Sequence, residues 1–291
     1  MTLIATLTLR EAPARALATA FDDHPLLWSN AFDLSEAGPD RWQVAVYFEA
    51  KPTAEERAAL EQLGAAHGGT FAIAPVPEAD WVAKSLEGLQ PVSAGRFNVH
   101  GAHDRARVPA NEIGIEIEAG LAFGTGHHGT TSGCLIAIDD LAKSRPIRTA
   151  LDVGTGSGVL AIALAKRAKT RVTASDIDPV AVAVARQNVR LNGAQAYMRT
   201  IVAKGLGHRL IAAGAPYDLI VANILAGPLV QLAPAIARHL KPGGSVILSG
   251  LLDEQARRVA AAYRAVRLTM ARTISRDGWA TLVVEKKRYA R

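Results

Sequence analysis

The sequence predicts an α/β protein whose larger part is a Rossmann-like domain with a doubly wound, mostly parallel sheet, preceded by a small ferredoxin-like α+β domain. One observation is a strand pattern at residues 149–153 that enters a glycine-rich turn and a helix, with an acid, Asp176, closing the next strand. The other is the order of short strand and helix patterns in the first part of the chain. We therefore place the small domain at residues 1–75, a linker at 76–107 and the Rossmann-like domain at 108–291.

Composition limits the class of protein. The chain has 291 residues, of which 49% are hydrophobic and 21% are charged, so it can bury one large core and a smaller one. Its single cysteine, Cys134, excludes an internal disulfide and fits a reducing compartment. The N-terminal segment is typical of a strand rather than of a signal peptide, and no apolar stretch reaches membrane-spanning length. We expect a cytoplasmic protein with no membrane partner.

The first 75 residues contain six short elements. Thr53 is followed three positions later by Glu56, which is the capping-box signature of a helix start. Turn signals at residues 37–40 and at Gly68-Gly69 separate other elements. The resulting order, β-α-β-β-α-β, is that of the ferredoxin-like split motif. The expected strands are 3–10, 30–34, 42–48 and 70–75, and the expected helices are 13–23 and 53–67.

The formal net charge of +6 hides an asymmetry. Residues 1–90 carry a net charge of −7, whereas the remainder of the chain carries +13. Opposite charges favour different partners for the two parts of the chain. An ordinary solubilising surface explains the same asymmetry equally well, because charge balance does not determine a fold.

The turn after the strand pattern has a glycine at every second position: Gly154, Gly156 and Gly158. Glycines adopt positive φ and let the backbone approach a ligand closely while a helix begins above it. The alternative is a loop that merely packs a helix closely on a strand. Asp176 stands about 20 residues past the first glycine, where a carboxylate that binds ribose hydroxyls is expected. Asp178, which precedes a proline, is instead interpreted as the N-cap of the next helix.

Residues 120–131 form a second unusual segment, with close glycines, adjacent histidines and two threonines before a helix expected at 132–143. No cysteine or carboxylate stands at zinc-like spacing around the histidines, so we expect no metal site. Thr130 or Thr131 could simply cap the helix. A polar loop of this composition has no obvious packing role, however, and is more typical of a ligand-binding segment.

An apolar strand at residues 217–222 runs out into Asn223. Doubly wound folds bind ligands beyond the carboxyl ends of their strands, so Asn223 is well placed to meet an acceptor molecule. An asparagine that caps the following helix is the alternative. Further strands are expected at 196–202 and 245–249, with a closing hairpin around Asp277-Gly278.

These motifs resemble those of class I S-adenosylmethionine-dependent methyltransferases, and their order closely resembles that of the bacterial PrmA-type methyltransferases. The matching segments are FGTGHHGTT at 123–131, DVGTGSG at 152–158, DIDP at 176–179 and NILAGPL at 223–229. The resemblance implies transfer of methyl groups from S-adenosylmethionine to the N-terminal and lysine amines of ribosomal protein L11. It also implies that the domain at residues 1–75 recruits this substrate.

The resemblance further implies which residues hold the cofactor. The glycine turn would face its methionine part, Asp176 would hold the ribose hydroxyls and Ile177 would lie against the adenine. Ala203-Lys204 stands where many methyltransferases place an acid near the adenine amine, and Gly129 stands where the family often has a larger residue. The expected cofactor-binding residues are Thr130, Asp152, Gly154, Thr155, Gly156, Gly158, Asp176, Ile177 and Asn223.

Methyl transfer to an amine needs alignment and a neutral nitrogen, but no metal and no covalent enzyme intermediate. Free lysine has a pKa of ~10.4, so the site must favour the neutral amine. Asn223, with the carbonyls of Ile224 and Leu225, is the candidate amine-binding site. Thr125 and His128 are the candidates for closing over cofactor and substrate.

Other functional classes stay open. A methyltransferase that acts on RNA would use the basic part of the chain to bind phosphates, but Asn223 is followed by Ile-Leu-Ala rather than by Pro-Pro-aromatic. Another lysine-containing protein could be the substrate, and a non-catalytic nucleotide-cofactor-binding module or a dehydrogenase is a different class again. We expect ribosomal protein L11 as the partner, no direct nucleic-acid binding and a monomer.

Overall fold

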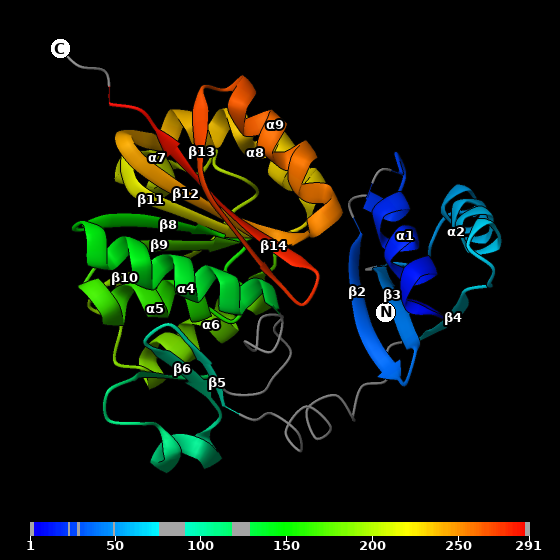
Figure 1. Ribbon diagram of the computed structural model, residues 1–291, viewed down its shortest axis with the longest axis horizontal. Helices are drawn as coiled ribbons and strands as arrows, with labels where there is room; N and C mark the ends of the chain where they lie inside the picture. Colours follow the sequence, from blue (N-terminus) through cyan, green and yellow to red (C-terminus); the bar gives the residue numbers. More distant parts are fainter. Residues whose placement is uncertain are drawn as a thin grey trace. The chain divides into compact units, whose positions relative to one another are not determined.

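The computed structural model describes residues 3–22, 24–27, 30–48, 50–75, 91–117 and 129–288. The chain divides into two compact units, Met1–Ala79 and Asp80–Arg291. The first unit is coloured blue to cyan in Figure 1, and the second unit follows it along the colour scale to red. Among the described residues, the first unit contains one sheet and the second contains two.

The first unit is a four-stranded antiparallel sheet with two helices. The strand order is β2-β3-β1-β4, and β1 pairs with both β3 and β4 in antiparallel register. This order confirms the predicted ferredoxin-like motif. The elements are β1 (Leu3–Leu9), α1 (Glu11–Asp22), β2 (Ala31–Gly38), β3 (Arg41–Phe48), α2 (Ala54–Ala66) and β4 (Ala72–Pro75).

Local sequence signals explain this unit well. Glu56 N donates a hydrogen bond to Thr53 Oγ1 (3.2 Å) and Thr53 N donates to Glu56 Oε2 (2.7 Å), which confirms the capping box at the start of α2. Helix α1 contacts β3, and the ring of Phe21 on α1 lies 5.7 Å from that of Phe32 on β2. Both rings are buried, so the sheet and helix share one core.

The second unit is built on a seven-stranded sheet with the order β10-β9-β8-β11-β12-β14-β13. β14 runs antiparallel to both neighbours, whereas the five strands from β10 to β12 pair in parallel. This is the predicted doubly wound, mostly parallel sheet. The strands are β8 (Thr149–Val153), β9 (Arg171–Asp176), β10 (Met198–Val202), β11 (Tyr217–Asn223), β12 (Leu240–Leu252), β13 (Leu268–Arg276) and β14 (Trp279–Lys286). The helices are α4 (Gly129–Ser144), α5 (Val159–Ala168), α6 (Pro179–Leu191), α7 (Arg209–Gly214), α8 (Ala226–His239) and α9 (Ala256–Ala265), with a short 3-10 helix η2 (Asp253–Gln255) before α9.

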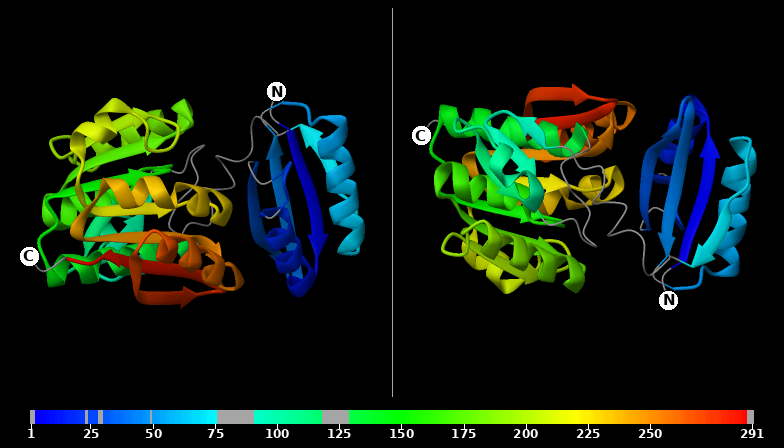
Figure 2. Two further views of the ribbon diagram at one scale, coloured as in Figure 1. Left: turned by 90° about the horizontal axis from the view of Figure 1, so that it is seen from above. Right: turned by 90° about the horizontal axis from the view of Figure 1, so that it is seen from below.

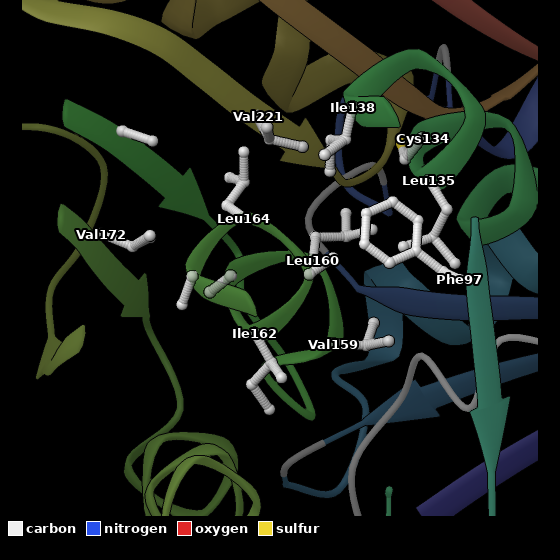
Figure 3. Packing of buried hydrophobic residues seen from close by; sticks show 14 of the residues in the cluster. Phe97, Cys134, Leu135, Ile138, Val159, Leu160, Ile162, Leu164, Val172 and Val221 are labelled. Atoms are coloured by element: carbon white, nitrogen blue, oxygen red, sulfur yellow. The ribbon is translucent and has the colours of Figure 1, made fainter. Parts of the chain in front are cut away.

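Helices cover both faces of this sheet, and successive residues of its central strands enter different cores. Ala150 and Val221 belong to a cluster with residues of α4 and α5, shown in Figure 3. Leu151 and Ile220 belong to a second cluster with residues of α7, α8 and α9. Burial of both faces explains why these strands are apolar throughout rather than alternating.

Residues 91–107 correct the expected linker at 76–107, because they are folded. They form β5 (Val92–Ala94), β6 (Phe97–His100) and the 3-10 helix η1 (Ala102–Arg107), and β5 and β6 make a three-stranded sheet with β7 (Ile113–Glu116). Phe97 is fully buried in the same cluster as Leu135 and Leu160, as Figure 3 shows. Strands of three and four residues are too short to give a clear periodic pattern. Residues 76–90 lie outside the described residues.

The end of the chain matches the predicted hairpin. β13 and β14 are joined by Asp277 (φ +53°) and Gly278 (φ +78°), the positive-φ pair that a tight two-residue turn requires. β12 spans Leu240–Leu252 and is therefore longer than the expected strand at 245–249. Among the helices that the structure describes, none has the length and apolar character needed to cross a membrane.

The side chain of Asn192 ties β7 to the end of α6. Its Oδ1 accepts a hydrogen bond from Glu116 N (2.9 Å), and its Nδ2 donates to Glu116 O (2.6 Å) and Asn188 O (2.8 Å). Glu116 is buried, so these bonds satisfy backbone groups that water reaches poorly. The three-stranded sheet is thereby fixed to helix α6.

We expect Asn192→Ala to lower the free energy of unfolding by about 2–3 kcal/mol, because it leaves the buried amide and carbonyl of Glu116 without partners. Urea denaturation measures the difference, with Asn111→Ala as a control at an exposed asparagine. Equal stability of the two variants would show that these bonds contribute nothing to the fold.

Candidate functional site

The glycine turn between β8 and α5 is anchored on β9. Gly154, Gly156 and Gly158 have φ values of +70°, +52° and +86°, as predicted for a turn that only glycine adopts without strain. The backbone amides of Gly154 and Thr155 donate to the carbonyl oxygen of Ser175 at 2.8 and 2.9 Å. The turn therefore begins in a position set by the neighbouring strand.

The start of α5 also packs closely on α6. A Cβ on Gly158 would lie 3.3 Å from Ala185 Cβ, so any larger residue there would press against α6. Asn188 Nδ2 donates to the carbonyl of Ser157 at 2.9 Å inside the same contact. Close packing of helices was the alternative explanation for the glycine turn. At Gly158 the structure shows such packing.

Asp176 ends β9 beside the turn. Its Oδ2 accepts a hydrogen bond from Gly156 N (2.9 Å) and its Oδ1 accepts one from Asp178 N (3.1 Å). A carboxylate offers about four acceptor positions, so about two stay available for a ligand. Asp178 Oδ1 accepts from Val180 N (2.8 Å), which confirms Asp178 as the N-cap of α6.

Large apolar side chains are exposed next to Asp176. Ile177 is 63% exposed and Val202, the register partner of Asp176 on β10, is 48% exposed. Exposed apolar side chains at the carboxyl ends of two adjacent strands are typical of a ligand-binding surface. Ala203 N donates to Asp176 O (2.8 Å), so the chain that follows β10 stays close to this carboxylate.

Asp152 lies beneath the turn and is almost completely buried, with 1% of its surface exposed. Its Oδ2 accepts a hydrogen bond from Thr155 Oγ1 (2.6 Å), whereas its Oδ1 has no partner among the described residues. Burial raises the pKa of Asp152 to about 7, and the negative charge of Asp176 acts in the same direction. The bond from Thr155 opposes this rise without reversing it.

Asn223 ends β11 and is half-buried, opposite Ser249 in the register with β12. Its side chain makes no hydrogen bond with any residue that the structure describes. Helix α8 begins at Ala226 with Leu225 as its N-cap, so Asn223 does not cap that helix. The structure therefore excludes the capping alternative.

The segment before α4 is described only from Gly129. Thr130 and Thr131 are buried inside the first turn of α4, so neither is the cap of this helix. The helix begins three residues before the expected position because Gly129 and its two threonines already have helical geometry. Thr125 and His128 lie outside the described residues.

A buried polar group that sequence patterns do not reveal lies next to Asn223, on the adjacent strand β12 and on β14. Ser249 Oγ is 2.9 Å from Thr281 Oγ1 and donates to Ala280 O (3.0 Å), and all of these atoms come from β12 and β14. Cys134 on α4 is fully buried nearby, and burial raises the pKa of its thiol to about 12, which makes it unreactive. The only sequence signal for this polar group is the position of Ser249 at the end of a predicted strand.

The residues at this edge of the sheet fit a nucleoside that carries an amino acid. Asp176 has acceptor capacity for two hydroxyl groups, and Ile177 and Val202 offer apolar surface beside it. The free Oδ1 of Asp152 is a buried acceptor below the turn. Within the described parts of the chain, no cluster of three or more His, Cys, Asp or Glu side chains could hold a metal ion.

Known proteins are similar to this chain in sequence and in fold. The family model of ribosomal protein L11 methyltransferase (PrmA) matches residues 6–287. A ribosomal protein L11 methyltransferase of Rhizobium leguminosarum is 52% identical over 245 residues, 84% of each chain. One from Rhodopseudomonas palustris is 48% identical over 283 residues, 95% of this chain and 94% of that protein. A ribosomal protein L11 methylase structure from Lactobacillus delbrueckii is 30% identical, with a TM-score of 0.60 over 69% of this chain and 100% of that one.

The raised pKa of Asp152 predicts a pH-dependent stability. From about pH 4, where a carboxyl in the unfolded chain ionises, up to about pH 7, Asp152 keeps its proton only in the folded protein, so stability falls as pH rises. We expect Asp152→Asn to remove this dependence. The unfolding free energy of the variant minus that of the wild type should rise by up to about 4 kcal/mol between pH 4 and pH 8.

Urea denaturation at several pH values within this range measures the difference. Asp178→Asn, at an exposed cap on the same edge of the sheet, is the matched control. A difference for Asp152→Asn that stays constant with pH would contradict the assignment.

Proposed function

The chain belongs to the ribosomal protein L11 methyltransferase (PrmA) family, and on this premise we propose that it methylates the lysine and N-terminal amines of ribosomal protein L11, using S-adenosylmethionine. The observation that carries the proposal is the match of the family model to residues 6–287, which spans both compact units. Relatives that share about half of their residues with this chain carry the same name.

The cofactor, when bound, supplies a methyl group on a sulfonium centre. We assign the ribose hydroxyls to Asp176, whose carboxylate keeps acceptor capacity, and the adenine to Ile177. The glycine turn, which includes Thr155 and has Asp152 beneath it, would hold the methionine part, and Thr130 at the start of α4 completes the cofactor-binding set. Because Ala203 and Lys204 follow β10, no acidic side chain there is available for the adenine amine.

The acceptor amine is assigned to Asn223. The side-chain oxygen of Asn223 is free to accept a hydrogen bond, and the carbonyls of Ile224 and Leu225 follow directly in the chain. A neutral primary amine has two N–H bonds, so two acceptors among these are enough to hold it with its lone pair directed toward a methyl donor. Partial burial of Asn223 also disfavours a charged amine, which must lose its proton before reaction. Thr125 and His128 would close over the bound molecules.

Recruitment of the protein substrate is assigned to the domain at residues 1–75. Residues 1–90 carry a net charge of −7, which complements the positive charge typical of RNA-binding ribosomal proteins. The enzyme would act as a monomer in the cytoplasm, where ribosomal proteins are made. We propose no direct role for nucleic acid, because the chain offers a free asparagine and carbonyls for an amine and no Pro-Pro-aromatic segment for a base.

The proposal is tested by incubating the protein with methyl-labelled S-adenosylmethionine and a mixture of bacterial ribosomal proteins and ribosomal RNA. We expect label on lysine and N-terminal amines of L11, located by mass spectrometry of its peptides. Label in RNA, or on a different protein, would favour one of the alternative substrates, and cofactor binding without any transfer would favour a non-catalytic module.

We expect Asp176→Ala to weaken S-adenosylmethionine binding by about 1.5–3 kcal/mol, the range for hydrogen bonds to a charged group. Calorimetric titration measures the affinity. Asp178→Ala, which removes only the helix cap, should reduce stability and leave affinity nearly unchanged. Unchanged affinity in the Asp176 variant would disprove the ribose assignment.

We expect Asn223→Ala to lower kcat substantially while cofactor affinity changes by less than about threefold, because an orienting contact acts mainly in the transition state. Steady-state methylation of L11 and cofactor titration provide the two measurements. Normal turnover in this variant would remove Asn223 from the acceptor site.

A further inference from the structure

Ile224 lies between two glycines from distant parts of the chain. It follows Asn223 at the end of β11, and the glycines belong to the turn after β8 and to β12. The chain separations are 70 residues to Gly154 and 26 to Gly250. No local pattern in the sequence connects these three positions.

The side chain of Ile224 occupies the space that a larger residue at position 154 would need. A Cβ on Gly154 would lie 2.3 Å from Ile224 Cγ2, well inside the distance at which carbon atoms meet. Gly154 therefore has two reasons to be glycine, its φ of +70° and this contact. The β-branch of Ile224 rests directly on the backbone of the glycine turn.

The backbone of Ile224 is held by β12. A Cβ on Gly250 (φ +83°) would lie 2.4 Å from Ile224 O and 2.9 Å from Ile224 N, so the backbones of these two segments are in contact at this point. Ile224 N also donates to Ser249 O at 3.1 Å. Ser249 is in turn bonded to Thr281 on β14. The backbone of the residue after Asn223 is thus held against the sheet by these contacts.

These contacts join the two halves of the proposed site. Asp176 accepts a hydrogen bond from the amide of Gly156, which belongs to the same turn as Gly154. Gly154 in turn contacts Cγ2 of Ile224. Asn223 is the next residue. A continuous series of close contacts therefore runs from the residue proposed to bind the ribose to the residue proposed to bind the acceptor amine.

We propose that Ile224 is a positioning residue, whose Cγ2 methyl group sets the spacing between the glycine turn and Asn223 and hence between methyl donor and acceptor amine. The inference rests on the proposed function, because it takes Asn223 as the acceptor residue. A displacement of about 1 Å at a reacting centre costs as much as 100-fold in rate, so a contact through a single methyl group is sufficient to matter.

A simpler role for Ile224 is to fill space at the margin of the core. It is half-buried and packs against the second hydrophobic cluster. The two roles make different demands on side-chain shape. A space-filling residue tolerates leucine, which has the same number of carbon atoms, better than the smaller valine. A spacer that acts through the β-branch requires valine, which keeps that branch, and excludes leucine, which lacks it.

The experiment compares Ile224→Val, Ile224→Leu and Ile224→Ala in the full chain. We expect the valine variant to keep kcat for L11 methylation within about threefold of wild type, and the leucine and alanine variants to lose on the order of 10- to 100-fold. The affinity for S-adenosylmethionine and the KM for L11 should each change by less than about threefold. Ile136→Leu, at a half-buried isoleucine of α4, is the matched control and should change none of these values.

Hydrogen–deuterium exchange gives a readout that does not depend on activity. We expect faster exchange at residues 153–160 and 222–226 together in the leucine and alanine variants, and wild-type exchange in the valine variant. Leucine performing as well as valine in both measurements would overturn the inference and leave a space-filling role. If the wild type methylates nothing, the proposed function fails, and exchange alone then decides whether Ile224 couples the two segments.

Discussion

The close contact of chain segments at the carboxyl ends of β8, β11 and β12 is the constraint on which the site depends. Parallel strands about 4.8 Å apart bring these ends together, but they leave the loops beyond them free to diverge. Here Gly154, in the turn after β8, and Gly250, near the end of β12, have no side chain and therefore let both segments contact Ile224. The turn proposed to hold the cofactor and the residue proposed to bind the acceptor are therefore joined by direct contacts, as catalysis by alignment requires.

Buried polar side chains lie near the carboxyl ends of the strands that carry the candidate site. Asp152 lies near the end of β8 and Ser249 lies near the end of β12. Both side chains are nearly inaccessible to water. Thr155 donates a hydrogen bond to one oxygen of Asp152, and the hydroxyl of Ser249 pairs with that of Thr281, so hydrogen bonds offset part of the cost of burying these polar groups. The exception is Asp152 Oδ1, an acceptor without a partner among the described residues. Its position below the turn means that a bound cation above would stabilise the charged form that burial disfavours.

The two compact units divide the molecule by charge as well as by fold. The ferredoxin-like unit belongs to the acidic part of the chain, whereas the sheet domain carries the basic excess. A separate acidic domain suits the proposed capture of a basic protein. The strands β5 and β6 and the helix η1 belong to the second unit, so residues 91–107 are not part of a connection between the units.

The sequence by itself determined the elements whose signals are local. The capping box at Thr53, the N-cap at Asp178 and the turn at Asp277-Gly278 depend on neighbouring residues, and each was predictable from them. The glycine turn and Asp176 were also predictable, because a strand, a turn and a second strand follow one another within 28 residues.

Only the tertiary structure decided which distant residues meet. The strands at residues 92–94 and 97–100 are recognisable only after Phe97 is seen in the core, since strands this short lack a pattern of their own. The sequence pattern explained Gly154 by the approach of a ligand, whereas the structure adds Ile224, 70 residues away, as a second reason. Such contacts follow from strand order, and strand order arises from the joint packing of all helices on both faces of the sheet, which no single segment encodes.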